Sequence, residues 1–480
     1  ACIITTDIDK ERRYALRLEQ LFTLCVRLFF SFNMASQHIV FSFAGQGFPP
    51  VEAARDLYRV SSTFRQAITD VQETINGLSH DGSIPGQAHV PLTDYFEEDE
   101  IRPPYAASFD RPLSATQHSL PPSATLVIVS AQYALGKLLQ SWGVSPQSVM
   151  AYSLGEIAAG TFTGSYTLPA MVKLLARREG LLEDRSLFPN KGGLALVFTD
   201  GDSIKQVLAK EGLLGTVDIA GFSSPGATCV AGDASQLDVA LEKLSDTDVD
   251  FKRVRLDIGM HSGHVQALAD HVRSSPDIFP ERDSKDCKVL PGIDHWSSLG
   301  IQLPTGSPLN ANHYATVLRR PLRYRDCVQK IFQKHMSEQR EQDLVFVDMG
   351  MGPGQLYKLI MAALEHTAEW QRGQVRAMAS IDPVDAGDAR NTLGWAKAQL
   401  KDNLSKAHVL LQKSSTSPGM TDPHYAHKHN KKVAARASNP VTKWKCMAGT
   451  AEKFADAQTC WFEGVNRLLL QLTSYDPNRT

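Results

Sequence analysis

The sequence lacks the features that mark several large classes of protein. Its 50 lysines and arginines are balanced by 52 aspartates and glutamates, so the basic excess typical of nucleic-acid-binding proteins is missing. The most apolar N-terminal run, residues 21–32, is too short to span a bilayer and is broken by Arg27. No internal repeat is visible. We therefore expect no nucleic-acid partner and no membrane span.

Cysteine is scarce and scattered. The seven cysteines form no Cys-x-x-Cys pair and no histidine–cysteine ladder with the spacing of a zinc site. We therefore expect neither a disulfide framework nor a metal site. Scattered cysteines in an odd number fit a reducing compartment, and we expect a cytoplasmic location. His424, His427 and His429 could bind a metal, but their polar, basic surroundings favour a solvated linker.

The order of predicted elements indicates an α/β protein. Strands expected over 38–44, 148–152 and 343–349 alternate with amphipathic helices such as that over 126–142, which favours a parallel sheet covered by helices. Residues 192–258 predict the order strand, helix, strand, strand, helix, strand, which is the ferredoxin-like βαββαβ unit. The sequence thus predicts a large α/β-hydrolase-like domain with an inserted ferredoxin-like small domain.

The rest of the chain is less patterned. We expect helices over 51–76 and around 311–332, with irregular surface loops over 78–123. Further helices are expected around 388–403 and over 447–475.

These patterns predict the following division of the chain. The large domain is expected to comprise residues 34–190 and 262–405, and the small domain residues 191–261. Residues 406–480 are expected to form a basic linker and a C-terminal helical tail. Residues 1–33 are expected to be a disordered extension or an artefact of the gene model, because MASQHIVFSFAGQG resembles a natural start. The alternative is a short membrane-surface or partner helix.

The strongest chemical signal surrounds Ser153. A predicted strand runs into Ala151-Tyr152-Ser153-Leu154-Gly155 and a predicted helix runs out, which is the context of a nucleophile elbow. Small residues at 151 and 155 let the strand and the helix pass closely. The helix N-terminus favours developing negative charge, and the N–H of Leu154 is placed to donate to an oxyanion. The alternative is an ordinary helix start with Ser153 as its N-cap.

Six segments follow one another along the chain in this order: FSFAGQGF, SWGVSPQSVMAYSLGEIAAG, IAGFSSPGATCVAG, GMHSGHV, RRPLRY and GMGPGQL. They resemble the successive signatures of malonyl-CoA:acyl-carrier-protein transacylases and of the acyltransferase domains of polyketide synthases. The resemblance covers roughly residues 38–380, and SWGVSP is closer to the polyketide-synthase form.

The resemblance implies a role for each matching residue. Ser153 matches the nucleophile and His261 the catalytic histidine, which the family holds through backbone carbonyls, so a Ser–His dyad without a third residue is implied. Gln46 and Leu154 match the oxyanion hole. Arg178 matches the arginine that binds the free carboxylate of malonyl groups, a role that suits the planar guanidinium.

Several of these positions also have simpler interpretations. Arg178 could pair with Glu179 or Glu183, and Arg177 is its neighbouring rival. His264 is a nearby competitor of His261. Gln46 could be an ordinary turn residue.

The implied function is transfer of a malonyl or related acyl group from CoA to the phosphopantetheine thiol of an acyl carrier protein, in polyketide or fatty-acid biosynthesis. The reaction would be ping-pong through an acyl-serine. It would need no bound cofactor, with acyl-CoA and a carrier protein or synthase as partners. Two alternatives remain: an editing acyl-thioester hydrolase, which Arg178 disfavours, and a catalytically decayed docking module. The latter is favoured by Tyr152, where the family has histidine.

Overall fold

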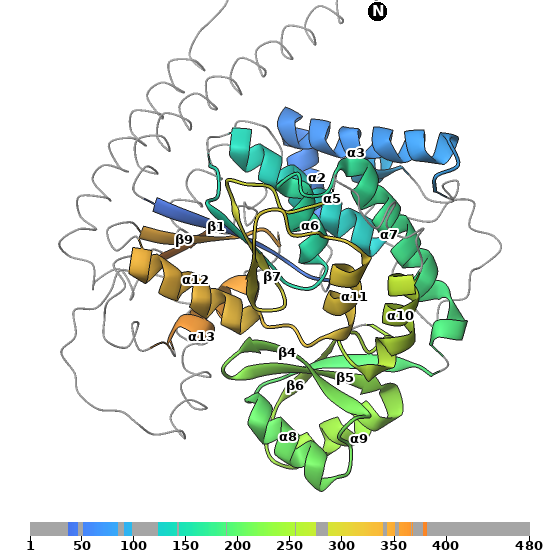
Figure 1. Ribbon diagram of the computed structural model, residues 1–480, viewed down its shortest axis with the longest axis vertical. Helices are drawn as coiled ribbons and strands as arrows, with labels where there is room; N and C mark the ends of the chain where they lie inside the picture. Colours follow the sequence, from blue (N-terminus) through green and yellow to red (C-terminus); the bar gives the residue numbers. More distant parts are fainter. Residues whose placement is uncertain are drawn as a thin grey trace, which may run out of the picture. The chain divides into compact units, whose positions relative to one another are not determined.

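The computed structural model describes most of the central part of the chain (Figure 1). The described residues are 37–46, 51–84, 91–97, 123–141, 144–188, 190–254, 256–274, 287–338, 343–350, 355–365, 367 and 378–381. All of them belong to one compact unit. The expected segments 1–33 and 406–480, and the helix around 388–403, lie outside the described residues.

A six-stranded sheet forms the centre of the fold. Its order is β10-β9-β1-β2-β7-β8; neighbouring strands are parallel except β7 and β8, which are antiparallel. The strands are β1 (Gln37–Phe43), β2 (Ser148–Ala151), β7 (Asp294–Ser297), β8 (Ile301–Leu303), β9 (Asp343–Asp348) and β10 (Met378–Ile381). Strands buried on both faces are typical of parallel sheets, and every residue of β2 is buried. The expected mixed α/β fold with a parallel sheet is confirmed.

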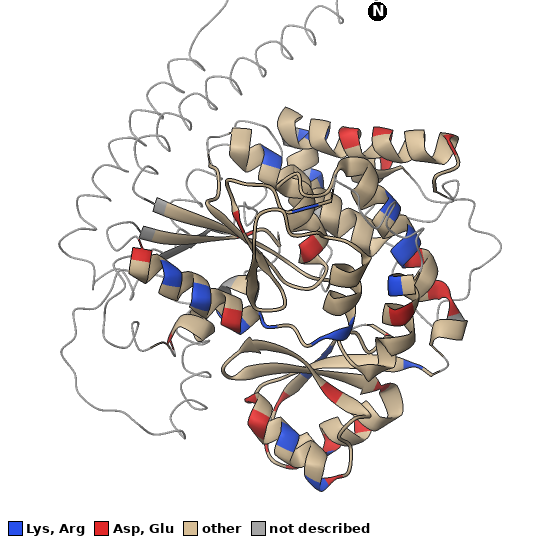
Figure 2. Cartoon of the chain, viewed as in Figure 1, with Lys and Arg blue, Asp and Glu red and all other residues tan. Residues whose placement is uncertain are grey.

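Helices pack around this sheet. They are α2 (Val51–Val60), α3 (Ser62–His80), α4 (Leu92–Glu97), α5 (Ala124–Ser141), α6 (Gly155–Phe162), α7 (Leu168–Glu183), α10 (Gln266–Ser274), α11 (Ala311–Arg319), α12 (Tyr324–Glu338) and α13 (Gln355–Glu365). Phe162 of α6 lies against Phe41 and Phe43 of β1, with ring centroids 5.4 and 5.7 Å apart. Charged residues lie mostly on the helices, and in this sheet they occur only at strand ends (Figure 2).

Three sequence-based expectations need correction. The helix expected over 51–76 is divided at Ser61, whose hydroxyl caps α3 by accepting from the Phe64 N–H at 3.2 Å. The loops expected over 78–123 contain the short helix α4. The helix expected around 311–332 is two helices, because Pro321 has no N–H to continue α11 and Arg320 before it is extended.

A second, four-stranded sheet lies below α11 in the view of Figure 1. It is fully antiparallel, in the order β4-β5-β3-β6. Its elements are β3 (Gly192–Val197), α8 (Gly201–Lys210), β4 (Val217–Ser224), β5 (Ala227–Asp233), α9 (Ala234–Ser245) and β6 (Phe251–Val254). Phe222 and Leu322 join this sheet to the loop before α12, since the Phe222 N–H donates to the Leu322 carbonyl at 2.8 Å.

Within the described ranges, no helix combines the length and apolar character needed to cross a membrane.

Candidate active site

Ser153 lies on a tight turn between β2 and α6. Its φ of 54° is in the left-handed region, which residues other than glycine seldom adopt and which often marks a functional site. Gly155 makes the turn possible, because a Cβ there would lie 2.3 Å from the Phe43 carbonyl oxygen. A Cβ on Gly45 would lie 2.7 Å from the Tyr152 carbonyl oxygen. The turn therefore brings Ser153 against the loop that follows β1.

The structure brings Ser153 and His261 together. Ser153 Oγ lies 2.8 Å from His261 Nε2, and His261 Nδ1 lies 2.8 Å from the carbonyl oxygen of Val317. A carbonyl can only accept, so Nδ1 carries the proton and Nε2 is left to accept the serine proton. This is the arrangement of a general base beside a hydroxyl nucleophile.

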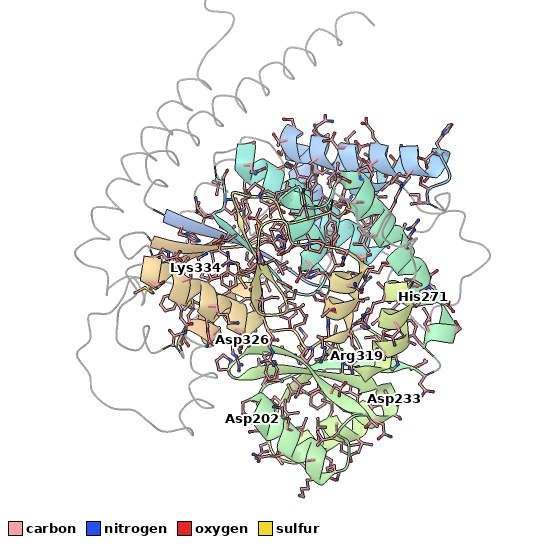
Figure 3. The ribbon with its side chains drawn as sticks, in the orientation of Figure 1. Asp202, Asp233, His271, Arg319, Asp326 and Lys334 are labelled. Atoms are coloured by element: carbon pink, nitrogen blue, oxygen red, sulfur yellow. The ribbon has the colours of Figure 1, made fainter. Side chains whose placement is uncertain are left out.

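The loop that carries His261 is held from two sides. The His261 N–H donates to the Leu318 carbonyl of α11 at 2.9 Å. The Gly263 N–H donates to Asp218 of β4 at 2.7 Å, and Arg319 is 3.7 Å from the same carboxylate. Figure 3 labels Arg319 at the end of α11, next to the four-stranded sheet. The histidine is thus fixed between α11 and β4.

The surroundings of His261 keep its ring neutral. The side chain is 4% exposed, and burial lowers its pKa to about 4. The hydrogen bond to Val317 opposes this shift, and the positive charge of Arg178 adds to it. At neutral pH the ring is therefore ready to accept a proton.

If Ser153 is acylated as the resemblance implies, the acylation rate should fall only when the pH drops towards about 4. The implied mechanism needs a neutral His261, so activity is expected above its folded-state pKa and is expected to be lost below it. The measurement is single-turnover acylation between pH 3.5 and 8, with folding checked by circular dichroism. Arg178→Met removes a nearby positive charge and should move the acid limb to higher pH. An acid limb at the ordinary histidine value of about 6.5 would contradict this account.

Gln46 and Arg178 meet beside this dyad. Gln46 Oε1 accepts from Arg178 Nη2 at 2.8 Å, which joins the loop after β1 to α7. Arg178 is only 6% exposed, and its Nη1 is 3.3 Å from Glu179 Oε1. The structure therefore places Gln46 against the guanidinium, and the alternative ion pair with Glu179 is also present.

Leu154 occupies the N-cap position of α6 and is 5% exposed. Its amide thus lies at the helix start, where N–H groups have no partner within the helix.

The loop after β1 is positioned by Gln132, which sequence reasoning missed. Its side-chain amide accepts from the Ala44 N–H at 2.7 Å and donates to the Ala44 carbonyl at 3.0 Å.

A buried polar network lies behind the serine. The carboxylate of Glu156 accepts from the Ser297 hydroxyl at 2.6 Å and from the Ser298 N–H at 2.5 Å, and His313 Nε2 is 3.4 Å away. The Ser298 hydroxyl in turn accepts from the backbone N–H of Ser153 at 3.0 Å. Glu156 therefore positions the backbone of Ser153 through Ser298.

Opposing effects act on Glu156. Burial raises its pKa, but the hydrogen bond and charge of His313, with the Ser297 hydroxyl, outweigh burial and lower the pKa to about 2. Glu156 stands in the quoted SLGE segment, so its presence was visible. Its partners were not, because β7 was not predicted.

Tyr152 links the elbow to the second sheet. Its hydroxyl lies 2.8 Å from Ser223 Oγ and 3.4 Å from Cys229 Sγ, and its ring packs edge-on against Tyr324 at 5.0 Å. Burial raises the pKa of Tyr152 well above its usual range, so the phenol is neutral. Tyrosine at this position leaves the Ser153–His261 hydrogen bond in place.

The rival histidine, His264, has a different environment. Its Nδ1 accepts from the Gly259 N–H at 3.3 Å, its Nε2 donates to the Asn190 carbonyl at 3.1 Å, and its ring stacks on Phe188. Both nitrogens are thus used in holding the loop.

In the part of the chain that the structure describes, no group of three His, Cys, Asp or Glu is arranged to hold a metal.

Comparisons with known sequences identify the family to which the chain belongs. The family model of the acyl transferase domain matches residues 40–353. The highly reducing polyketide synthase sdnO of Sordaria araneosa is 28% identical over 316 residues, which are 65% of this chain and 9% of that synthase. Polyketide synthase GfsB of Streptomyces halstedii is 26% identical over 75% of this chain and 6% of its own length. The chain thus spans less than a tenth of either relative.

Solved structures share the fold. The acyltransferase domain of the polyketide synthase PpsC of Mycobacterium tuberculosis matches 72% of this chain and 91% of its own, with a TM-score of 0.54 and 21% identity. The malonyl CoA-acyl carrier protein transacylase (fabD) from Coxiella burnetii matches 78% and 99%, with a TM-score of 0.53 and 17% identity. At these identities the likeness concerns the fold.

Proposed function

Because the chain belongs to the acyl transferase domain family, we propose that it moves a malonyl or related acyl group from CoA to the phosphopantetheine thiol of an acyl carrier protein. The acyl group is carried as an ester on Ser153. The observation that carries this proposal is the 2.8 Å hydrogen bond between Ser153 Oγ and His261 Nε2 at a strained turn.

The geometry supports a ping-pong mechanism. His261 Nε2 takes the proton of Ser153 Oγ as the oxygen attacks the thioester carbonyl. The N–H groups of Leu154 and Gln46 stabilise the oxyanion, and the Val317 carbonyl stabilises the charged imidazole. The C–S bond then breaks, and His261 returns the proton to the departing CoA sulfur. In the second half-reaction His261 deprotonates the phosphopantetheine thiol, which attacks the ester and restores Ser153.

Arg178 is proposed to bind the free carboxylate of a malonyl group. Its guanidinium is nearly buried, so an ion pair there is poorly screened by water. Its charge lowers the pKa of His261, which supports a position of the acyl carboxylate near the Ser153–His261 pair. Gln46 holds the Nη2 group in place through the hydrogen bond that its side-chain oxygen accepts.

We also infer that residues 191–261 form a ferredoxin-like small domain inserted between residues 34–190 and 262–405 of an α/β-hydrolase-like large domain. The strand order β4-β5-β3-β6, with two helices in the chain order of a βαββαβ unit, supports this. A carrier protein or synthase is the proposed partner. The reaction as written uses no bound cofactor.

The test of transfer uses pantetheine as a surrogate acceptor, because the carrier protein is not identified. The protein is mixed with malonyl-CoA, with and without pantetheine, and products are separated by liquid chromatography and mass spectrometry. We expect malonyl-pantetheine with acceptor and little free malonate without it. Rapid release of malonate in both cases would indicate a hydrolase. Unconsumed malonyl-CoA would indicate a docking module.

A further inference from the structure

The guanidinium of Arg178 already faces a carboxylate of its own chain. Glu179 Oε1 lies 3.3 Å from Arg178 Nη1, while Gln46 occupies Nη2 at 2.8 Å. We propose that Glu179 is a specificity-determining residue, an internal counter-ion that weakens the preference of the acyl site for carboxylated acyl groups. This inference rests on the proposed role of Arg178 as the carboxylate-binding residue.

Glu179 is held in place by a second element. The Thr125 hydroxyl, in the first turn of α5, donates to the same Glu179 Oε1. The start of a helix also favours a nearby negative charge. The Glu179 side chain is 18% exposed, so water screens it only partly. The Glu179 carboxylate is therefore held beside Arg178 by two contacts.

Among the described residues, the other groups that interact with Arg178 bring no negative charge. Gln46 is a neutral amide, His261 is neutral because burial lowers its pKa, and Tyr314 is a neutral phenol because burial raises its pKa. A malonyl carboxylate bound to Arg178 would thus meet one anion, Glu179, on the same guanidinium. The Glu179 carboxylate and the malonyl carboxylate would repel each other at this distance. Arg178 would have to bind both carboxylates at once, or lose its contact with Glu179.

An uncharged acyl group such as acetyl has no carboxylate to bind Arg178, so Glu179 does not repel it. Glu179 should therefore lower the ratio of malonyl to acetyl transfer without changing the chemistry at Ser153. The neighbouring carboxylate was visible in the sequence as a possible partner of Arg178. The contact with Thr125, which fixes it there, was not.

The test compares Glu179→Gln with the unsubstituted chain, measuring kcat/KM for acyl-enzyme formation from malonyl-CoA and acetyl-CoA. Glutamine keeps an oxygen for the Thr125 hydroxyl and removes the charge. We expect the malonyl-to-acetyl ratio to rise about tenfold, equal to about 1.4 kcal/mol, almost entirely through the malonyl rate. Glu183→Gln, one turn further along α7 and exposed, makes the same charge change and should alter the ratio less than twofold.

A double-variant measurement separates an effect on specificity from an effect on structure. In an Arg178→Met background, Glu179→Gln should leave the ratio unchanged, because the repulsion acts through the shared guanidinium. An unchanged ratio in the single variant, or an equal change for both thioesters, would overturn the proposal and leave Glu179 a packing residue. Absence of any Ser153 ester in the unsubstituted chain would instead remove the proposed function, and this inference with it.

Discussion

Replacing His261 with alanine is expected to slow acylation of Ser153 by about a thousandfold. A positioned general base contributes roughly 10²–10⁴ to such a step, and no other base lies at hydrogen-bond distance from Ser153 Oγ among the described residues. The measurement is rapid-quench acylation with malonyl-CoA at pH 7. The residual rate should also lose the acid limb near pH 4, because that limb belongs to His261.

His264→Ala is the matched control, since its ring nitrogens contact Gly259 and Asn190 and do not contact the serine. It should slow acylation less than fivefold. A His261→Ala variant that keeps more than a tenth of the rate would show that another group takes the serine proton.

Glu156→Ala is expected to destabilise the folded protein by about 3–5 kcal/mol, the cost of breaking a buried charged network by removing one partner. It leaves the Ser298 N–H, the Ser297 hydroxyl and His313 without their shared acceptor. The measurement is urea unfolding at pH 7. Glu156→Gln should recover much of the stability, because an amide oxygen can still accept from Ser297 and Ser298.

The pH dependence of this effect has a defined sign. The folded-state pKa of Glu156 is lowered to about 2 from an ordinary 4.5, so its charge stabilises the fold above pH 4.5. That contribution is lost as the pH falls towards 2, and the difference between the unsubstituted chain and Glu156→Gln should shrink over this window. A loss below 1 kcal/mol for Glu156→Ala would show that the network is not needed.

Much of the central fold was accessible from local patterns. The strands β1, β2 and β9 are short apolar runs bounded by turn residues, and α5 follows helical spacing, so they were predicted nearly at their observed ends. The strands β7 and β8 were missed. They have three or four residues each, with few apolar positions, and form because β7 pairs with β2.

The candidate site likewise has residues with a local sequence signal and contacts that only tertiary packing creates. Ser153 and Gly155 carry a local signal, since the turn demands a small residue where the helix passes β1. His261 was found by resemblance, and its distance from the serine depends on packing between segments 108 residues apart. The contacts of Tyr152 with Ser223, and of Ser298 with Ser153, join distant segments and have no local signature.

The central claim, an acyl ester on Ser153, is tested most directly by intact-protein mass spectrometry after mixing with malonyl-CoA, followed by peptide mapping. We predict one malonyl adduct on the peptide that contains Ser153, absent from Ser153→Ala and discharged by pantetheine. No adduct in the unsubstituted chain, or an adduct that persists in Ser153→Ala, would contradict the account.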